Sequence, residues 1–530
     1  MKRPLIRFLS VLLCVSLLLP CAGFLSFAEN EAVVPKIFLD GINSSATLDS
    51  TTGEVVYPPT FDTIVGALKG NLPPTVSSLI KGDFDAMTDP VSDAVIKIFE
   101  PIAMDENGQP LYPTVADFSY PTKEEIDTIM SEGGKTGTIA FDTHYIHYTY
   151  DWRLDMQTIA ADFHDFVEYI LDQTGAEQVD VVSFSMGTCV LLTYMKVYDC
   201  EYLRHVVLDA GAFNGVTTTG EPFVGDITFD SKALVTYLST MVGENMGLAL
   251  LDAVIKSLYQ IGVVDRVTEL ANKIVAGASD QLYEKAFRRV FSRIPGFWSL
   301  VPYELYDRAK EMLIVPGEFV TDEYVAKLDF YHEQIQGQNV QILSDALDKG
   351  VQFSIIAKYG SMIPPVCDHQ TNIGDSVIDT YRESLGATCS VIGETLGEDY
   401  TQAVDDGHDH LSADGQIDAS TCAFPEYTWF LKGRNHSEHV ADEFAFTDWL
   451  LSRDAQPTVW DSELYPQFMI LDRETQVYVP LTAENNYERY EPVERGETFF
   501  ARIRNLFGIM RDFFRTLFGS MFKKQANTIS

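Results

Sequence analysis

Residues Val179 to Thr188 read Val-Asp-Val-Val-Ser-Phe-Ser-Met-Gly-Thr, and this stretch indicates the fold more directly than any other part of the chain. A short apolar strand runs straight into the pattern small-x-Ser-x-Gly, which is centred on Ser185. A strand that turns sharply into a helix at such a serine exposes its hydroxyl, and the positions two before and two after it must be small. Gly187 meets this requirement, and Ser183 stands where glycine is usual.

The sequence on both sides of the serine supports this interpretation, because apolar residues recur there at helical spacing. These residues are Ile159, Phe163, Phe166 and Ile170 before the strand, and Leu191, Leu192, Tyr194 and Met195 after the serine. Helix, strand, serine turn and helix is the order in which α/β hydrolases place their nucleophile. We therefore predict an α/β-hydrolase fold with a mostly parallel sheet flanked by helices. The alternative is a buried serine on an ordinary strand-to-helix turn.

The remaining periodicity divides the chain into segments. Strand-like runs at 36–45, which ends in a glycine-containing loop, and at 138–142, 205–212 and 352–360 alternate with helical patterns, as in a parallel sheet covered on both faces. Between them, residues 216–345 are rich in helical stripes and contain no strand-like run. We predict a signal peptide (1–28), a first core part (29–215, with an irregular insertion at 46–135), a helical cap (216–345), a second core part (346–453), a linker (454–496) and a C-terminal helix (497–524).

Composition excludes one class of partner. The chain has 530 residues, is 46% hydrophobic and carries a formal net charge of -39. It can bury a large core, but a nucleic-acid phosphate backbone requires a basic face, and residues 29–490 offer no large one. We therefore predict no nucleic-acid partner.

The two ends of the chain have patterns of their own. Basic residues before the apolar run 8–19, followed by small residues at Ser26 and Ala28, are typical of a secretory signal peptide and predict a secreted, extracellular protein. In 497–524, aromatic and aliphatic residues follow one helical face and Arg and Lys follow the other. Such a helix suits a membrane surface, and docking on the protein's own acidic body is the alternative.

A serine nucleophile requires a histidine base and a carboxylate that orients the histidine. In this fold the acid and then the histidine follow the serine along the chain. Asp414 lies beside a glycine in a loop after the strand at 352–360, and His436 lies in a loop before the last core helix. We predict Ser185, Asp414 and His436 as the catalytic triad, with Asp418 as the rival acid and His439 as the rival base.

Several motifs in this order resemble the lecithin:cholesterol acyltransferase family, which includes lysosomal phospholipase and phospholipid:diacylglycerol acyltransferases. They are Tyr150-Asp151-Trp152-Arg153, Ser185-Met186-Gly187, the stretch Pro295 to Pro302, Tyr359-Gly360, Asp414-Gly415 and Gly433-x-x-His436. The resemblance implies acyl transfer or hydrolysis at Ser185. It also implies an oxyanion hole made by the backbone N–H groups of Ile42 and Met186. Asp40-Gly41 in place of Pro-Gly, and Ser183 in place of Gly, depart from the family pattern.

We predict no cofactor and no metal. The acidic and histidine-rich run 405–410 lacks the oxygen spacing of a calcium loop and the frame of a zinc site. The predicted function is that of a secreted serine hydrolase or O-acyltransferase acting on lipid or other carboxylic esters through an acyl-enzyme. The alternative is a non-catalytic lipid- or surface-binding protein that retains the fold. A fluorophosphonate probe separates the two, because only an enzyme is labelled at Ser185.

Overall fold

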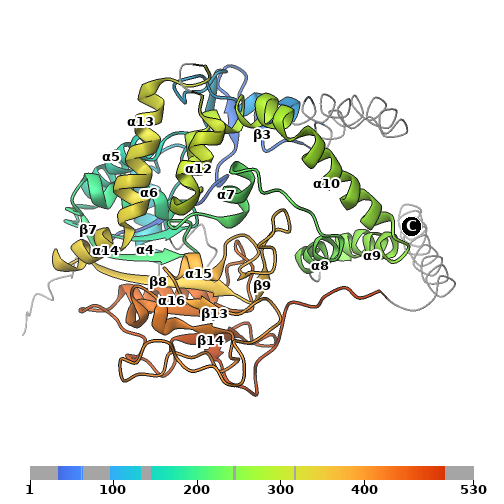
Figure 1. Ribbon diagram of the computed structural model, residues 1–530. Coiled ribbons are helices and arrows are strands. Elements are labelled where there is room, and N and C mark those ends of the chain that lie inside the picture. Colours follow the sequence, from blue (N-terminus) through green and yellow to red (C-terminus); the bar gives the residue numbers. More distant parts are fainter. Residues whose placement is uncertain are drawn as a thin grey trace, which may run out of the picture.

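The computed structural model describes residues 34–60, 96–132, 145–242, 246–315 and 318–495, together with residues 63 and 93. This part of the chain forms an eight-stranded sheet, in which the strands lie side by side in the order β15-β14-β13-β8-β7-β6-β1-β5 (Figure 1). Its strands are β1 (Lys36–Leu39), β5 (Ile146–Tyr148), β6 (Val179–Phe184), β7 (Leu203–Asp209), β8 (Gln352–Tyr359), β13 (Thr428–Lys432), β14 (Phe468–Leu471) and β15 (Tyr478–Pro480). Neighbouring strands are parallel except β14 and β15, which are antiparallel.

Helices cover the sheet on both faces, so its central strands are buried along most of their length and are largely apolar. On one face, alternate residues such as Ile37 and Val181 pack with α5 (Met156–Thr174), α6 (Gly187–Val197) and α14 (Asn339–Asp348). The intervening residues point to the other face, where α16 (Ala441–Leu451) packs with them. The prediction of a mostly parallel sheet flanked by helices is confirmed.

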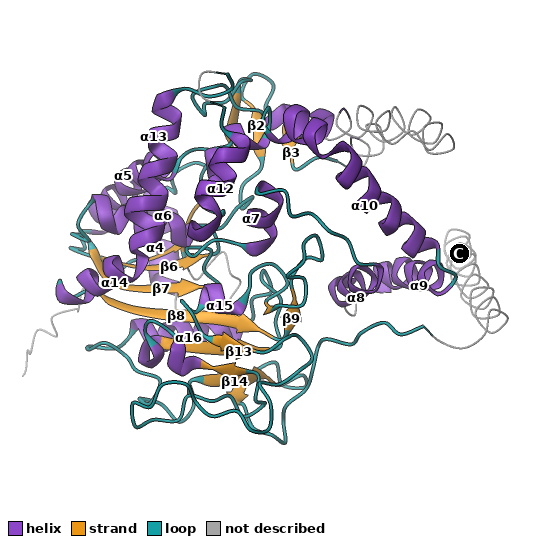
Figure 2. Ribbon diagram, in the orientation of Figure 1, coloured by secondary structure: helices purple, strands orange, loops and turns teal. Residues whose placement is uncertain are grey.

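Between β7 and β8 the described residues are helical, as the sequence predicts, and no strand lies among them. The helices are α7 (Thr217–Phe223), α8 (Ser231–Val242), α9 (Met246–Gln260), α10 (Val263–Leu282), α11 (Pro295–Ser299), α12 (Tyr303–Leu313), α13 (Asp322–Phe330) and α14. Helices α8 and α9 pack together at one side of the molecule, and α10 leads from them back toward its main body (Figure 2). Helices α11, α12 and α13 share an apolar cluster around the buried side chain of Trp298.

Two of the predicted segments differ from the structure. The predicted linker 454–496 contains β14 and β15, which extend the sheet beyond α16. These two strands are only four and three residues long, too short for a periodic pattern to stand out. The predicted irregular insertion contains a three-stranded antiparallel sheet of β2 (Thr47–Asp49), β3 (Val55–Tyr57) and β4 (Thr114–Ala116), followed by α4 (Lys123–Glu132). The predicted signal peptide, the strand at 138–142 and the helix at 497–524 lie outside the described residues.

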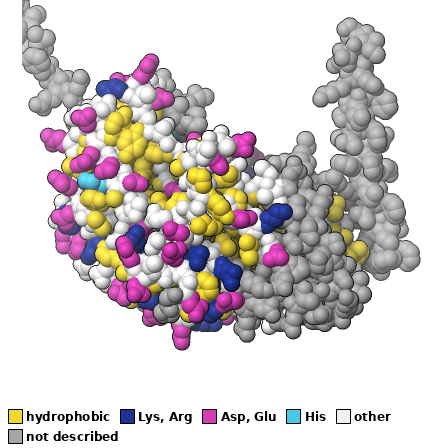
Figure 3. Space-filling model, turned by 90° about the horizontal axis from the view of Figure 1, so that it is seen from above, with side chains coloured by type: hydrophobic (Ala, Val, Ile, Leu, Met, Phe, Trp, Pro, Cys, Tyr) yellow, Lys and Arg dark blue, Asp and Glu magenta, His cyan; other side chains and the backbone are white. Residues whose placement is uncertain are grey.

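Two further features of the described part concern the length of its apolar helices and the charge of its surface. No helix in it combines the length and the apolar character that crossing a bilayer requires. On the face shown in Figure 3, acidic side chains are spread over the surface and basic side chains are interspersed among them. That face therefore presents no large basic area.

The connection from β8 to β13, residues 360–427, positions much of the site. It contains two small antiparallel pairs, β9 (Ser361–Met362) with β10 (Ile373–Gly374) and β11 (Thr388–Cys389) with β12 (Ile417–Asp418). A single helical turn, α15 (Thr380–Glu383), lies between the pairs. The connection folds back over the end of β8 and carries several buried carboxylates.

Candidate active site

The strand β6 ends at Phe184 and the helix α6 begins at Gly187, so the turn between them is very tight. Ser185 has a φ of 54°, a left-handed conformation that is strained for a residue with a side chain. A Cβ atom at Gly187 would overlap the carbonyl oxygens of Leu39 and Asp40, so this position accepts only glycine. The predicted serine turn is therefore present, with its strain located at the serine itself.

Ser183 occupies the position where glycine is usual, and the structure accommodates its side chain. The residue is fully buried on β6, and its Oγ donates a hydrogen bond to the carbonyl oxygen of Val207 on β7, at 3.2 Å. The neighbouring strand thus satisfies the added hydroxyl, and the turn keeps its shape.

His436 meets the serine as predicted. It lies in the loop that follows β13, and its Nε2 is 2.9 Å from the Oγ of Ser185. On the other side of the ring, Nδ1 is hydrogen-bonded to a carboxylate oxygen of Asp375. The backbone N–H of His436 also donates to the carbonyl oxygen of Asp375, at 2.6 Å. With Nδ1 donating to the carboxylate, Nε2 is free to accept the proton of the serine.

The carboxylate bonded to His436 in the structure is that of Asp375, and the prediction that Asp414 holds this position is wrong. Asp375 is fully buried, and its Oδ1 accepts the backbone N–H groups of Val377 at 2.9 Å and Ile378 at 2.8 Å. Burial acts to raise the pKa of Asp375, but His436 and hydrogen bonds to the carboxylate, including that from the N–H of Ile378, outweigh burial and hold the pKa below its ordinary value. Asp375 is therefore ionised at neutral pH and presents its other oxygen, Oδ2, to the histidine.

Asp414 lies on the same connection but faces a different group. Its Oδ2 accepts from the ammonium of Lys432 at 2.8 Å and from the hydroxyl of Tyr359 at 3.1 Å, and its Oδ1 accepts from Ser412 at 2.6 Å. The rival acid Asp418 accepts from Tyr400 and from the backbone N–H groups of Ala403 and Ser420. Neither carboxylate contacts His436.

The sequence contained a weak signal for the correct acid. Asp375 follows Gly374, lies after the same strand as Asp414, and obeys the same chain order of serine, acid and histidine. Both aspartates therefore satisfy the chain order of serine, acid and histidine. What distinguishes them is the ion pair between Asp414 and Lys432, a contact between separate segments that the rule of order does not contain.

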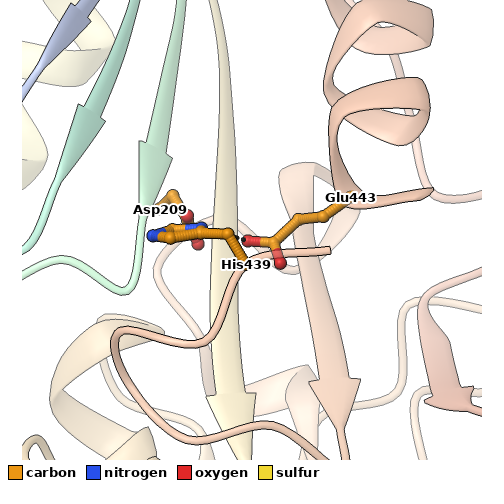
Figure 4. A group of neighbouring side chains, drawn as sticks. All are labelled: Asp209, His439 and Glu443. Atoms are coloured by element: carbon orange, nitrogen blue, oxygen red, sulfur yellow. Dashed lines mark hydrogen bonds and ion pairs between the residues drawn. The ribbon is translucent and has the colours of Figure 1, made fainter. Parts of the chain in front are cut away.

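The rival base His439 belongs to a separate buried cluster. Its Nδ1 is 3.2 Å from Glu443 on α16, and Asp209 at the end of β7 lies beside them (Figure 4). The ammonium of Lys358, fully buried, is 2.9 Å from Glu443 and 3.5 Å from Asp209. Burial raises the pKa of Asp209 to about 6, although Lys358 acts in the opposite direction. Because Lys358 supplies a cation here, the cluster is a buried ionic network that needs no metal ion.

The predicted oxyanion residues lie beside the serine. A Cβ atom at Gly41 would be 2.8 Å from the Cβ and 3.3 Å from the Oγ of Ser185, so the loop after β1 runs directly against the nucleophile. Ile42 follows Gly41 in this loop, and Met186 follows Ser185 at the start of α6. The positions of Ile42 and Met186 suit the predicted oxyanion hole, which stays a prediction.

The Tyr-Asp-Trp-Arg segment holds the loops around the site. The guanidinium of Arg153 is fully buried and donates to Asp151 through Nε at 2.8 Å and Nη2 at 2.6 Å, and to Thr114 through Nη1 at 2.9 Å. The backbone N–H of Gly296, on α11, donates to the carbonyl oxygen of Arg153 at 3.2 Å. A Cβ atom at Gly296 would also be 3.1 Å from the methyl group of Met186. The motif therefore links the helical region to the serine turn.

Comparison with known proteins adds little to this geometry. No protein-family model and no curated protein sequence matches the chain. Among solved structures, the chain is similar to one described as the crystal structure of the Tle4-Tli4 complex, with 12% identity and a TM-score of 0.27. The similarity covers 90% of this chain and 98% of that one. At this identity and TM-score, the likeness carries no information about the chemistry of the site.

Proposed function

We propose that this protein is a serine hydrolase of the α/β-hydrolase type that cleaves carboxylic esters through an acyl-enzyme. The observation that carries the proposal is the continuous hydrogen-bonded chain from Ser185 through His436 to Asp375. Nucleophilic ester cleavage requires a serine in a strained turn, a histidine whose Nε2 is hydrogen-bonded to that serine, and a buried ionised acid.

In the first half of the reaction, the Oγ of Ser185 attacks the ester carbonyl carbon while its proton passes to Nε2 of His436. Asp375 stabilises the imidazolium that forms. The oxyanion would accept hydrogen bonds from the N–H groups of Ile42 and Met186. As the tetrahedral intermediate collapses, the C–O bond to the alcohol breaks and His436 protonates the departing alcohol. In the second half, water attacks the acyl carbon while its proton passes to Nε2 of His436. The bond between the acyl carbon and Oγ then breaks, and His436 returns the proton to Ser185.

The substrates we propose are lipid esters. The region 216–345 would act as a cap, which is supported by the contact of α11 with Met186 and with the segment of Trp152. Ser185 and His436 are 5% and 6% exposed, so both residues are largely shielded from bulk water. The basic and aromatic segment 497–524 would bring the enzyme to a membrane surface, and 1–28 would direct it out of the cell.

The second acceptor is a separate question. Water and an alcohol resolve the same acyl-enzyme, and we propose water. Transfer to an alcohol is what the resemblance to the lecithin:cholesterol acyltransferase family implies. Product analysis with a labelled acyl donor in the presence of a sterol or diacylglycerol distinguishes free fatty acid from a new ester.

The test uses the full chain with Ser185→Ala alongside it. We expect labelling by a fluorophosphonate probe and turnover of p-nitrophenyl esters, with preference for the longer acyl chain, and loss of both in the variant. An unlabelled wild-type protein that still binds phospholipid vesicles would overturn the proposal in favour of a lipid-binding protein. Equal turnover of short and long esters would keep the hydrolase and remove the lipid preference.

A further inference from the structure

A second carboxyl group lies behind the acid of the triad. Glu383, the last residue of α15, is fully buried. Its Oε2 accepts the backbone N–H of Lys358 on β8, at 2.7 Å. Its Oε1 is buried, and no donor reaches it from the described residues. Carboxylate oxygens of Glu383 and Asp375 and a ring nitrogen of His436 all lie within 4.8 Å of one another.

Two carboxylates this close, both shielded from water, cannot both be ionised, so one of them holds a proton. The hydrogen bonds decide which one. Asp375 accepts from two backbone N–H groups and from the imidazole, whereas Glu383 accepts from one backbone N–H only. The charge is therefore far better stabilised on Asp375. The proton resides on Glu383, where it turns the otherwise unpartnered oxygen into a donor.

The charges around Glu383 favour the same assignment. The ionisable groups facing it are Asp375, His436, Lys358 on β8 and the thiol of Cys389 on β11. The ammonium of Lys358 is already bonded to Glu443, at 2.9 Å. Burial, together with the negative charge of Asp375, raises the pKa of Glu383 well above its ordinary value.

We propose that Glu383 is a positioning residue, whose neutral carboxyl group donates a hydrogen bond to Asp375 and holds it ionised and aligned with His436. This inference rests on the proposed hydrolase. It extends the chain of hydrogen bonds to four residues: Ser185, His436, Asp375 and Glu383. The hydrogen bond from the O–H of Glu383 withdraws negative charge from the oxygens of Asp375. The carboxylate therefore attracts the proton on the imidazole less strongly. Glu383 thereby sets the acidic limit of the pH range in which His436 acts as a base.

The decisive variant is Glu383→Gln, because an amide can accept the N–H of Lys358 and donate to Asp375, as a neutral carboxyl does. We expect kcat within about twofold of wild type and an unchanged acidic limb of the kcat/KM profile. Glu383→Leu removes the donor at similar size. We expect it to lower kcat by about 10- to 100-fold and to move the acidic limb to higher pH, with KM little changed.

Active sites are counted with a fluorophosphonate probe, so that loss of folded protein is not read as loss of kcat. Glu443→Gln, at the neighbouring buried glutamate that pairs with Lys358, is the matched control, and its acidic limb should stay in place. A shifted limb in Glu383→Gln would mean that the wild-type carboxyl is charged, and this would overturn the proposal. An unchanged kcat and limb in Glu383→Leu would also overturn it.

A second measurement does not depend on turnover. Infrared difference spectra between wild type and Glu383→Gln at neutral pH should contain the C=O stretch of a protonated carboxyl group in the wild type only. The band is expected whether or not the protein hydrolyses an ester. Absence of turnover with the band present would refute the proposed function alone. Absence of the band would refute the assignment of the proton to Glu383.

Discussion

Two regions of the connection between β8 and β13 each carry a buried aspartate, and they use it differently. Asp375 accepts hydrogen bonds from two backbone N–H groups and from an imidazole. Asp414 accepts from the ammonium of Lys432, from the hydroxyls of Tyr359 and Ser412, and from the backbone N–H of Gln416. Both side chains are fully shielded from solvent. Burial and chain order are therefore shared, and the nature of the partner is what separates them.

The difference shows what a triad acid requires. A carboxylate that already neutralises a permanent cation has little attraction left for a charge that forms transiently. Asp375 has no lysine or arginine bonded to it among the described residues, so its charge is available when the imidazole of His436 becomes an imidazolium. Asp414 with Lys432 instead fastens the connection to the end of β13. In the proposed reaction Asp375 would serve catalysis, whereas the contact of Asp414 with Lys432 serves the fold.

The largest expected effect separates these roles directly. Asp375→Asn should lower kcat by roughly 10³- to 10⁴-fold, because an amide neither favours the correct tautomer of His436 nor stabilises the imidazolium. The matched change Asp414→Asn, on the same connection, should leave kcat within about threefold. The measurement is ester turnover per folded protein at neutral pH, with folding checked by circular dichroism. If the two variants exchanged these results, Asp414 would be the acid, as the sequence alone suggested.

The next effect concerns stability. Lys432→Met should cost about 3 to 5 kcal/mol of unfolding free energy, because it leaves Asp414 buried without its cation. Glu488, at 2.6 Å from the same ammonium, loses its partner as well but is part-exposed and can recruit water. Urea denaturation measures the loss. Turnover per labelled active site should stay near wild type, and a loss of 100-fold or more there would show that this region takes part in catalysis.

The sequence predicted the residues whose signal is local. Ser185 stands in a strand-turn-helix pattern, and His436 stands in a loop before an apolar helix, and both patterns are readable within about ten residues. The acid could not be chosen in this way. Asp375 and Asp414 differ through Lys432, which is 18 residues from Asp414 in sequence but 2.8 Å from it in space. Only tertiary structure shows which carboxylate is already paired.

The fold shows the same limit. The long central strands β6, β7 and β8 were predicted because parallel strands buried on both faces are predominantly apolar. The edge strands β14 and β15 were missed, since their short apolar runs stand between polar turns. They become strands through pairing with β13, which is a contact made by the finished sheet.

A third carboxylate tests the comparison by pH. Glu443 is paired with Lys358 at 2.9 Å. Although it lies near the triad, it is therefore, like Asp414, a buried carboxylate neutralised by a lysine. Burial acts to raise the pKa of Glu443, but Lys358 and His439 outweigh burial and lower it to about 2. Because the folded pKa is below the unfolded one, the stabilisation is complete above about pH 4.5 and is lost as the pH falls toward 2.

Glu443→Gln should therefore be less stable than wild type by about 3 kcal/mol at pH 7, and the gap should close between about pH 4.5 and pH 2. Urea denaturation at a series of pH values measures the gap. Asp209 remains as a partner for Lys358 at 3.5 Å, so the variant should still fold at neutral pH. A gap that stays constant down to pH 2 would show that Glu443 stabilises by packing and not by its charge.

The smallest expected effect comes from removing a single uncharged hydrogen-bond donor to Asp414, the aspartate that is paired with Lys432. Tyr359→Phe removes the hydroxyl that donates to Asp414 at 3.1 Å but keeps the aromatic ring, which lies 5.5 Å from the ammonium of Lys432. We expect a loss of about 1 to 2 kcal/mol in urea denaturation and no change in kcat, since the ion pair remains. A loss as large as that of Lys432→Met would mean that the hydroxyl, and not the cation, holds Asp414 in place. Pairing with a lysine would then no longer be what distinguishes Asp414 from Asp375.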